Sequence, residues 1–208
     1  MSLKTFVKIS TINNLSDARY CAGMYVNLMG FSLEENNGNY ISPEKFKEIT
    51  DWLSGLEYVA EFEASHPDKI LEIVKAYPGI GYLEIQEEIH LKMLVNSSYG
   101  LILKCKVEEV EEIEDLIAKS SSYADFGVTL HLVSDTLELN ELTTSKIKEL
   151  ATKCQVLLGF GIDASTIEEV LESTQVKGIS LEGGDEIKPG LKDFDALADI
   201  LEVLELDN

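Results

Sequence analysis

Two hydrophobic patterns alternate along the whole chain. Short apolar runs of strand length recur, and the segments between them place apolar residues three or four positions apart, as on one face of a helix. The predicted strands are 4–9, 26–32, 57–63, 80–86, 100–106, 126–134, 155–159 and 177–182, and the predicted helices are 16–22, 43–54, 67–76, 87–95, 108–119, 143–153, 164–173 and 193–204. Eight strand–helix pairs in 208 residues are typical of a (β/α)8 TIM barrel.

Residues at the predicted helix starts support this pattern. Ser42 precedes Pro43, which suits an N-cap followed by proline at the first helical position. Candidate caps of two further helices are Asn14 or Ser16, and Asp163 or Ser165. A doubly wound open sheet would show the same alternation with fewer repeats. No Pro/Gly/Ser-rich linker divides the sequence, so we predict one domain over residues 1–208.

The composition narrows the class of partner. Apolar residues make up 45% of the chain, and 17 basic against 38 acidic residues give a formal net charge of −21. This acidic protein would be repelled by phosphate backbones and anionic membranes, so we expect neither nucleic acid nor a membrane as a partner. The sequence has no 18-residue apolar run and no secretory signal pattern, which predicts a cytoplasmic protein.

The cysteines do not indicate a metal centre. Cys21, Cys105 and Cys154 are widely spaced and form no zinc-binding pattern, so we expect reduced, mostly buried thiols. Carboxylates at a barrel mouth could hold Mg²⁺, but the candidates there, Glu61, Glu84 and Glu182, have no D-x-D or H-x-D spacing among them. We therefore expect neither a metal nor a cofactor.

Motifs at both ends of the chain resemble one enzyme family. The opening "FVKISTINNLSDARYCAG", the segment "NYISPEKFKEI" and the closing "KGISLEGGDEIKPGLKDFDALADIL" are similar to the corresponding segments of phosphoribosylanthranilate isomerase. That family is a TIM barrel of tryptophan biosynthesis that performs an Amadori rearrangement of a phosphoribosyl amine. The resemblance implies an isomerase without a cofactor, a small-molecule substrate that is a phosphorylated sugar derivative, and a monomer or homodimer.

The departures from the family pattern fall on positions that carry chemistry. Ser10 stands where the family has a cysteine that acts as general base, and Thr11 stands where it has glycine. Asn39 replaces an arginine that contacts the substrate carboxylate, and Glu182 replaces a serine that contacts phosphate. We therefore predict a degraded catalytic site.

The chemistry expected of the two candidate catalytic residues differs. A serine hydroxyl does not ionise near neutral pH without a strong partner, so we predict that Ser10 does not act as the base. Asp135, at the end of the sixth predicted strand, is the candidate general acid, and Asp125 is its competitor. His131, on the same strand as Asp135, is interpreted as a core histidine.

Phosphate binding is predicted at the loops after the seventh and eighth strands. The candidate backbone amides belong to Gly159, Gly161, Gly183 and Gly184. The carboxylate of Glu182 opposes them, as would Glu61 and Glu84 if they face the mouth, against only Lys104 and Lys106. We expect a mouth that is negative or nearly neutral and that holds phosphate weakly.

The leading hypothesis is a phosphoribosylanthranilate isomerase-like barrel in which the catalytic groups have changed. One alternative is a catalytically silent relative that acts through partner binding. The other is a barrel enzyme with a different, less anionic substrate.

Overall fold

The computed structural model describes residues 2–182, 186–188, 191–192 and 195–206. Eight parallel strands, each paired with its sequence neighbour, close into a barrel through pairing of the first strand with the eighth. The strands are β1 (Phe6–Ser10), β2 (Leu28–Ser32), β3 (Glu57–Glu61), β4 (Ile80–Ile85), β5 (Gly100–Lys106), β6 (Thr129–Val133), β7 (Gln155–Leu158) and β8 (Gly178–Glu182). The predicted TIM barrel is confirmed, and the open-sheet alternative is wrong.

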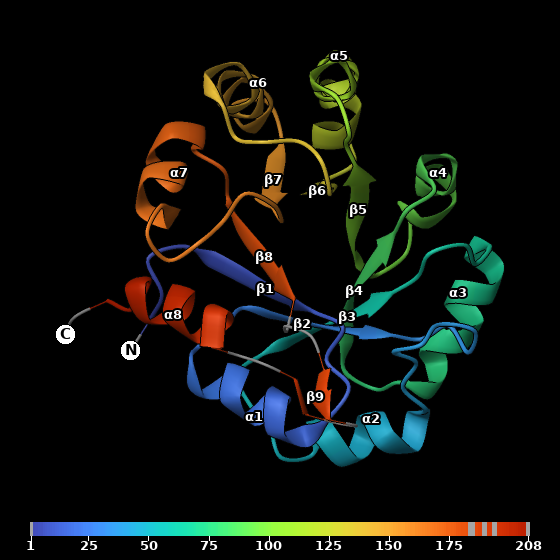
Figure 1. The fold of residues 1–208 in the computed structure, drawn as a ribbon. Helices are drawn as coiled ribbons and strands as arrows, with labels where there is room; N and C mark the ends of the chain where they lie inside the picture. Colours follow the sequence, from blue (N-terminus) through green and yellow to red (C-terminus); the bar gives the residue numbers. More distant parts are fainter. Residues whose placement is uncertain (1, 183–185, 189–190, 193–194, 207–208) are drawn as a thin grey trace.

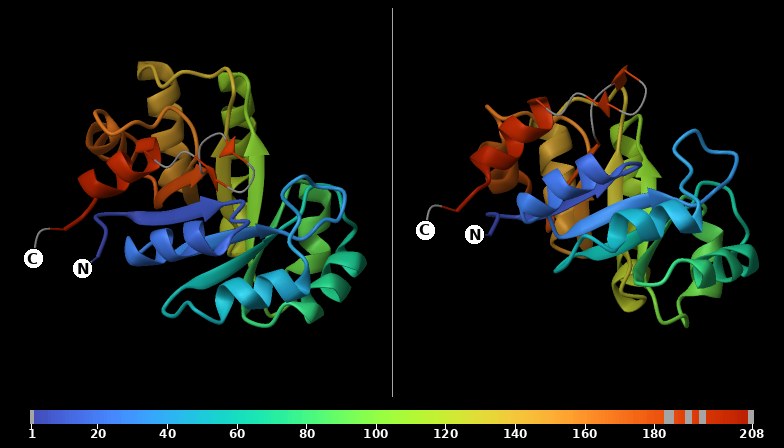
Figure 2. Two further views of the ribbon diagram at one scale, coloured as in Figure 1. Left: turned by 60° about the horizontal axis from the view of Figure 1, so that its bottom comes forward. Right: turned by 90° about the horizontal axis from the view of Figure 1, so that it is seen from below.

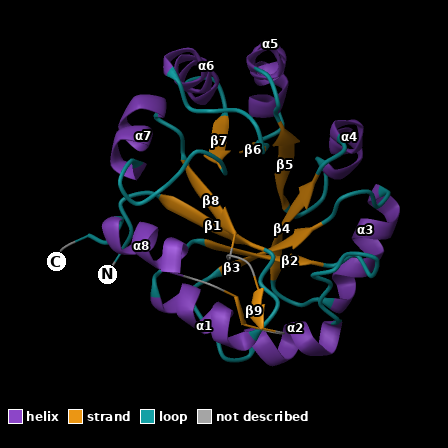
Figure 3. Ribbon diagram, viewed as in Figure 1, coloured by secondary structure: helices purple, strands orange, loops and turns teal. Residues whose placement is uncertain are grey.

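The helices form a ring around these strands, as Figures 1 and 3 show. They are α1 (Leu15–Gly23), α2 (Pro43–Thr50), α3 (Pro67–Ile73), α4 (Leu91–Leu94), α5 (Val110–Asp125), α6 (Glu141–Ala151), α7 (Ile167–Thr174) and α8 (Asp195–Val203). A short 3₁₀ turn, η1 (Val74–Ala76), extends α3, and a second one, η2 (Glu88–His90), precedes α4.

Two of the predicted helix starts are capped by their predicted side chains. Asn14 accepts a hydrogen bond from the amide of Asp17, and Ser42 accepts one from the amide of Lys45 with proline at the first helical position. These side-chain oxygens satisfy amides that have no partner inside the helix. Asp163 instead forms a turn before α7, because its side chain accepts hydrogen bonds from the amides of Ser165 and Thr166. That helix therefore begins at Ile167, later than predicted.

Three segments differ from the sequence prediction. The helix expected over 87–95 is a 3₁₀ turn followed by one turn of α-helix. The helix expected over 108–119 continues to Asp125, so the following strand begins only at Thr129. A two-stranded antiparallel sheet, β9 (Glu186–Lys188) with β10 (Leu191–Lys192), follows β8 and was not predicted.

The hydrophobic core has two parts. The larger part lies between the strands and the surrounding helices. The smaller part lies inside the barrel, where Leu28, Val59 and Ile102 pack against Phe6 and Tyr82. These five side chains, called here the apolar plug, fill the amino-terminal half of the barrel interior. The inward-facing side chains further along the strands therefore line the carboxyl-terminal half.

The two ends of the described chain lie together, as the views in Figure 2 agree. Leu3 and Glu205 form an isolated antiparallel bridge, and the amide of Leu206 donates to the carbonyl of Ser2. Within the described residues, no helix has the length and apolar character needed to cross a membrane.

Candidate active site

A buried polar cluster lies inside the barrel above the apolar plug. Its centre is Lys8, whose side chain is fully buried. The Lys8 Nζ atom lies 2.6 Å from Glu61 Oε1, 3.1 Å from Glu84 Oε2 and 2.6 Å from Ser10 Oγ. These side chains reach the same level because β1, β3 and β4 present alternate residues to the barrel interior.

The charges in this cluster stabilise one another. Burial acts to lower the pKa of Lys8, but the carboxylates of Glu61 and Glu84 more than offset it, so the pKa is raised. Burial acts to raise the pKa of Glu84, but Lys8 and His131 more than offset it and the pKa is lowered. Lys8 is therefore an ammonium between two carboxylates, not a neutral amine. Our expectation that Lys104 and Lys106 are the only basic residues at this end was wrong.

Ser10 lies at the carboxyl end of β1, as predicted, and its side chain is part of this buried cluster. It is 1% exposed, receives the hydrogen bond from Lys8, and lies 3.4 Å from Ser180 Oγ. A protonated lysine cannot take the proton of Ser10, and its charge is compensated by two carboxylates. The contacts support a structural role for this hydroxyl.

The residue after Ser10 adopts a backbone conformation that favours glycine. Thr11 has φ of 55°, and its amide donates to Glu61 Oε2 over 3.1 Å. A β-branched residue in this region is strained by about 1–2 kcal/mol. The turn after β1 thus keeps the shape that a glycine would take, although a threonine occupies it.

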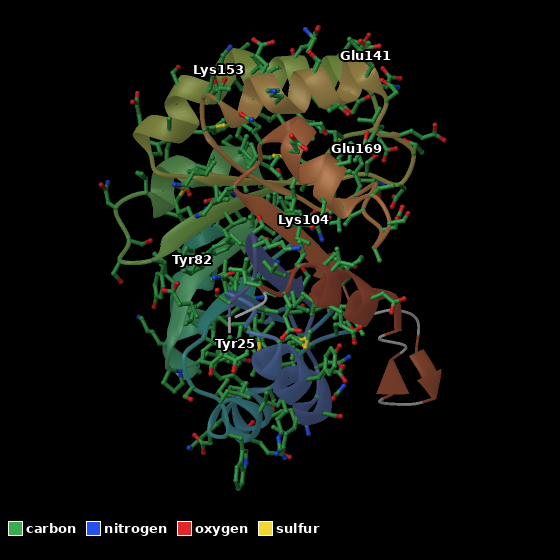
Figure 4. The ribbon with its side chains drawn as sticks, turned by 90° about the vertical axis from the view of Figure 1, so that its left-hand side faces the viewer. Tyr25, Tyr82, Lys104, Glu141, Lys153 and Glu169 are labelled. Carbon is green, nitrogen blue, oxygen red and sulfur yellow. The ribbon has the colours of Figure 1, made fainter. Side chains whose placement is uncertain are left out.

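The mouth of the barrel holds a cavity of about 510 Å³. Its wall is built from the ends of β4 to β8 and includes Gln86, Lys104, Lys106, His131, Ser134, Asp135, Gly159, Gly161, Ser180 and Glu182. Figure 4 shows Lys104 in the middle of the molecule, whereas Glu141 and Glu169 lie on the outer helices α6 and α7, and Lys153 lies in the turn after α6. Lys104 Nζ lies 3.7 Å from Glu182 Oε1, so the carboxylate that we expected to repel phosphate has a cationic neighbour.

Asp135 is at the mouth, but its carboxylate is already paired. Its side chain is 78% exposed and lies 2.8 Å from Lys106 Nζ, which also contacts Glu108. The hydrogen bond and charge of Lys106 lower the pKa of Asp135, which favours the ionised form over the protonated form that a general acid needs. The competitor Asp125 is the last residue of α5, ahead of β6 and away from the mouth, so that alternative is wrong.

Of the predicted phosphate-binding glycines, the structure describes Gly159 and Gly161, and both line the mouth cavity. The amide of Gly159 donates to the carbonyl of Leu132 over 2.8 Å and is not available to a ligand, so that assignment was wrong. Gly161 lines the cavity with φ of 66°, and a Cβ there would lie 2.7 Å from Leu139 Cγ. Gly183 and Gly184 lie outside the described residues.

Asn39 lies beside the mouth and does not line its cavities. It sits in the loop between β2 and α2, and its side-chain oxygen accepts a hydrogen bond from Asn13 Nδ2 over 3.3 Å. Asn37 instead lines a smaller cavity of about 30 Å³ that also touches Glu61 and Lys104. The structure thus brings Asp135, Gly159, Gly161 and Glu182 to one cavity and leaves Asn39 outside it.

Sequence reasoning missed the pairing of His131 with Glu84. His131 Nδ1 lies 3.0 Å from Glu84 Oε2, and both side chains are buried. The histidine is hydrogen-bonded inside the barrel as expected, but it also lines the mouth cavity. The available signal was the strand alternation, since His131 and Glu84 each stand between outward-facing apolar residues of their strands.

No thiol replaces the family's cysteine at this mouth. All three cysteines are free, and none lines the cavities of the mouth. Burial raises the pKa of Cys21 and of Cys105 to about 12 and that of Cys154 to about 11. Across the part of the chain that the structure describes, no three His, Cys, Asp or Glu side chains are grouped so that they could hold a metal ion.

Comparisons with known proteins find similarity to phosphoribosylanthranilate isomerases. No protein-family model matches the chain. The N-(5'-phosphoribosyl)anthranilate isomerase of Chlorobium phaeobacteroides is 25% identical over 203 residues, which cover 90% of this chain and 91% of that protein. The phosphoribosyl anthranilate isomerase structure from Thermotoga maritima superposes with a TM-score of 0.79 at 21% identity, covering 96% and 98% of the two chains. A phosphoribosyl anthranilate isomerase in complex with reduced 1-(o-carboxyphenylamino)-1-deoxyribulose 5-phosphate gives 0.77 at 20% identity, with the same coverage.

The closed barrel of eight parallel strands, with a polar cavity at their carboxyl ends, places the chain in the class of TIM barrels. The full-length similarity to curated sequences narrows the comparison: the chain resembles phosphoribosylanthranilate isomerases, at the low identity of a divergent relative.

The buried cluster predicts how stability depends on pH. Because the pKa of Glu84 is lowered in the folded protein, this group stabilises the fold above its ordinary value of 4.5, and the contribution is lost as the pH falls. The raised pKa of Lys8 acts in the opposite direction, since its contribution is complete below 10.5 and is lost at higher pH. We expect the urea midpoint to fall from pH 5 towards pH 3 less steeply in Glu84→Gln than in the wild type. Glu48→Gln, on the exposed surface, should keep the wild-type slope; equal slopes in all three proteins would contradict the prediction.

Proposed function

We propose that this chain is an isomerase of the phosphoribosylanthranilate isomerase type whose proton-transfer groups have been replaced. It converts the phosphoribosyl amine of anthranilate into the corresponding amino-deoxy ketose, an Amadori rearrangement in tryptophan biosynthesis. The observation that carries the proposal is the full-length likeness to isomerases combined with an acid–base cavity at the carboxyl-end mouth.

The cavity suits a substrate of this kind. Its volume of about 510 Å³ lies within the range of small-molecule sites. One related isomerase binds a reduced carboxyphenylamino-deoxyribulose phosphate, which supports a phosphorylated sugar derivative as the substrate class. Lys104 is the cation of the wall that would attract the anionic groups, because it has one carboxylate partner at 3.7 Å, Glu182, whereas Lys106 lies within 2.9 Å of both Asp135 and Glu108.

The proposal also covers the compartment, the oligomeric state and the partners of the protein. As an enzyme that acts on a small molecule, this chain would work in the cytoplasm, as a monomer or homodimer. Neither nucleic acid nor a membrane is a partner of a chain with a net charge of −21.

Complementation of a tryptophan auxotroph that lacks this isomerase is the test, together with turnover of phosphoribosylanthranilate by the purified protein. Growth at normal expression and measurable turnover are the expected results. A folded protein that neither supports growth nor turns over the substrate would contradict the proposal.

The replacement of Ser10 by alanine should change the isomerase rate by less than about tenfold, or roughly 1.4 kcal/mol in barrier. Ser10 is buried and accepts a hydrogen bond from the protonated Lys8, whereas a positioned base would contribute 10²–10⁴-fold. The measurement is kcat/KM of Ser10→Ala against the wild type. Loss of activity by more than about a hundredfold, with the fold intact, would show that this hydroxyl takes part in the chemistry.

A second candidate is a catalytically silent relative that acts by binding a partner. The observation in its favour is that both residues matching the family's catalytic positions are engaged, Ser10 by Lys8 and Asp135 by Lys106. A third possibility, turnover of a less anionic substrate, is favoured only if the purified protein binds but does not convert phosphoribosylanthranilate.

A further inference from the structure

A carboxylate–imidazole pair faces the mouth cavity from inside the barrel. His131 on β6 is 1% exposed and Glu84 on β4 is 2% exposed, and Nδ1 of the ring lies 3.0 Å from the carboxylate. An ionised carboxylate only accepts hydrogen bonds, so it fixes the proton of the neutral ring on Nδ1. The lone pair of the ring is then on Nε2.

The free nitrogen of this pair is directed at the cavity wall beside Gly159. A Cβ atom on Gly159 would lie 2.9 Å from His131 Nε2, so the absent side chain makes the space beside that nitrogen. Both residues line the cavity, and Nε2 has no hydrogen-bond partner among the described residues. A buried ring that is fixed on one side and unpartnered on the other is poised to exchange a proton with a bound molecule.

The groups around the pair keep Glu84 ionised. Lys8 from β1 contacts the same Glu84 oxygen that the histidine contacts, and Glu61 from β3 shares that lysine. Lys104 from β5 adds positive charge near Glu84, and it is itself paired with Glu182 from β8. The pair thus has a carboxylate that orients the ring, in place of a thiol that acts alone.

We propose that His131, oriented by Glu84, is the catalytic base of this chain and supplies the proton transfer that the family assigns to the cysteine at the Ser10 position. The inference rests on the proposed function, because it concerns the same isomerisation. Glu84 is a positioning residue, and Gly159 provides the room for the ring.

The proton transfer acts on the ring-opened iminium form of the substrate. His131 Nε2 takes the proton from C2′, the C–H electron pair forms a double bond between C1′ and C2′, and the iminium π electrons return to nitrogen as its lone pair. The imidazolium then returns the proton to C1′. The C2′ hydroxyl loses its proton to water and becomes the ketone, which releases the one proton that ring opening had consumed.

The test compares His131→Asn with the wild type. Asparagine keeps a nitrogen donor close to the position of Nδ1, so the contact with Glu84 can be retained while Nε2 is lost. We expect kcat for phosphoribosylanthranilate to fall 10²–10⁴-fold with KM changed less than about threefold. His90→Asn is the matched control, because His90 lies outside both mouth cavities, and it should keep full activity.

Two further readouts separate proton transfer from a structural role. The pH–rate profile of the wild type should have an acidic limb that is missing from the residual rate of His131→Asn. Glu84→Gln should lower kcat less than His131→Asn does, because the base is still present but less well oriented.

The outcomes are distinct for the two proposals. If the wild type turns over the substrate and a folded His131→Asn stays within about tenfold of its kcat, the assignment of the base is overturned and the proposed function stands. If the wild type shows no turnover, the proposed function fails, and the assignment that rests on it fails with it. If His131→Asn does not fold, Glu84→Gln decides the question: an unchanged pH–rate profile overturns the assignment, and a shifted acidic limb supports it.

Discussion

Replacement of Lys8 by methionine should destabilise the folded protein by about 3–5 kcal/mol. The change removes the ammonium between Glu61 and Glu84 and leaves two carboxylates inside the barrel without their shared cation. Methionine has nearly the same length, so the loss of packing is small and the loss of charge pairing dominates. Chemical unfolding in urea at pH 7, followed by circular dichroism, measures the difference in the free energy of unfolding.

The controls for Lys8→Met test the cause of the effect. Lys45→Met removes an exposed lysine whose ion pair with Glu48 is on the surface, and it should leave the unfolding midpoint almost unchanged. The double variant Lys8→Met with Glu84→Gln should recover part of the loss, because one of the two stranded charges is removed. A stability of Lys8→Met within about 1 kcal/mol of the wild type would refute the view that this lysine holds the cluster together.

The order of strands and helices could be predicted because each pattern repeats with little interruption. The strand predicted at 80–86 is observed at Ile80–Ile85, and that at 100–106 is observed with the same bounds. Helix limits were less predictable where tertiary contacts decide them. The chain at 87–95 forms a 3₁₀ turn and a four-residue helix, and Tyr123, near the end of the longer α5, donates to Glu88 in that turn.

The contents of the site were less predictable than its place. The sequence indicates that Lys8 and Ser10 share one face of β1, since they alternate with the apolar residues Val7 and Ile9. It does not indicate that Lys8 reaches Glu61 and Glu84, because that depends on the tilt of the strands and the stagger of the closed barrel. The family resemblance pointed to Ser10 and Asp135, which match the family's catalytic positions, and not to Lys8.

A single-strand pattern also cannot reveal which two polar residues meet across the barrel. His131 and Glu84 come from strands that are not neighbours, so their pairing requires the closed barrel and its register. Gly159 was interpreted as a donor of a backbone amide, but in the structure that amide belongs to the barrel and the missing side chain accommodates the histidine ring. A glycine thus marks a close approach of a side chain here, not a phosphate site.

Replacement of Gly178 by alanine should destabilise the barrel by about 3 kcal/mol or more. Gly178 begins β8 and lies opposite Phe6 of β1, at the pairing that closes the barrel. A Cβ there would lie 1.9 Å from the Phe6 carbonyl oxygen and 2.7 Å from its carbonyl carbon, both of which are backbone atoms. No rotamer change can relieve a contact with a strand backbone, so β1 and β8 must move apart and their shared hydrogen bonds must lengthen.

Gly23→Ala is the matched control for this substitution. Gly23 ends α1, and a Cβ there would meet no atom within 4 Å, so alanine should be neutral or stabilise by up to about 1 kcal/mol through its higher helix propensity. Thermal and urea unfolding of both variants gives the comparison, and the closing pair of strands in Gly178→Ala should also exchange its amide protons faster than the wild type. Equal stability of Gly178→Ala and Gly23→Ala would show that β1 and β8 accept a side chain at Gly178. That result would contradict the close pairing of Gly178 with the Phe6 backbone.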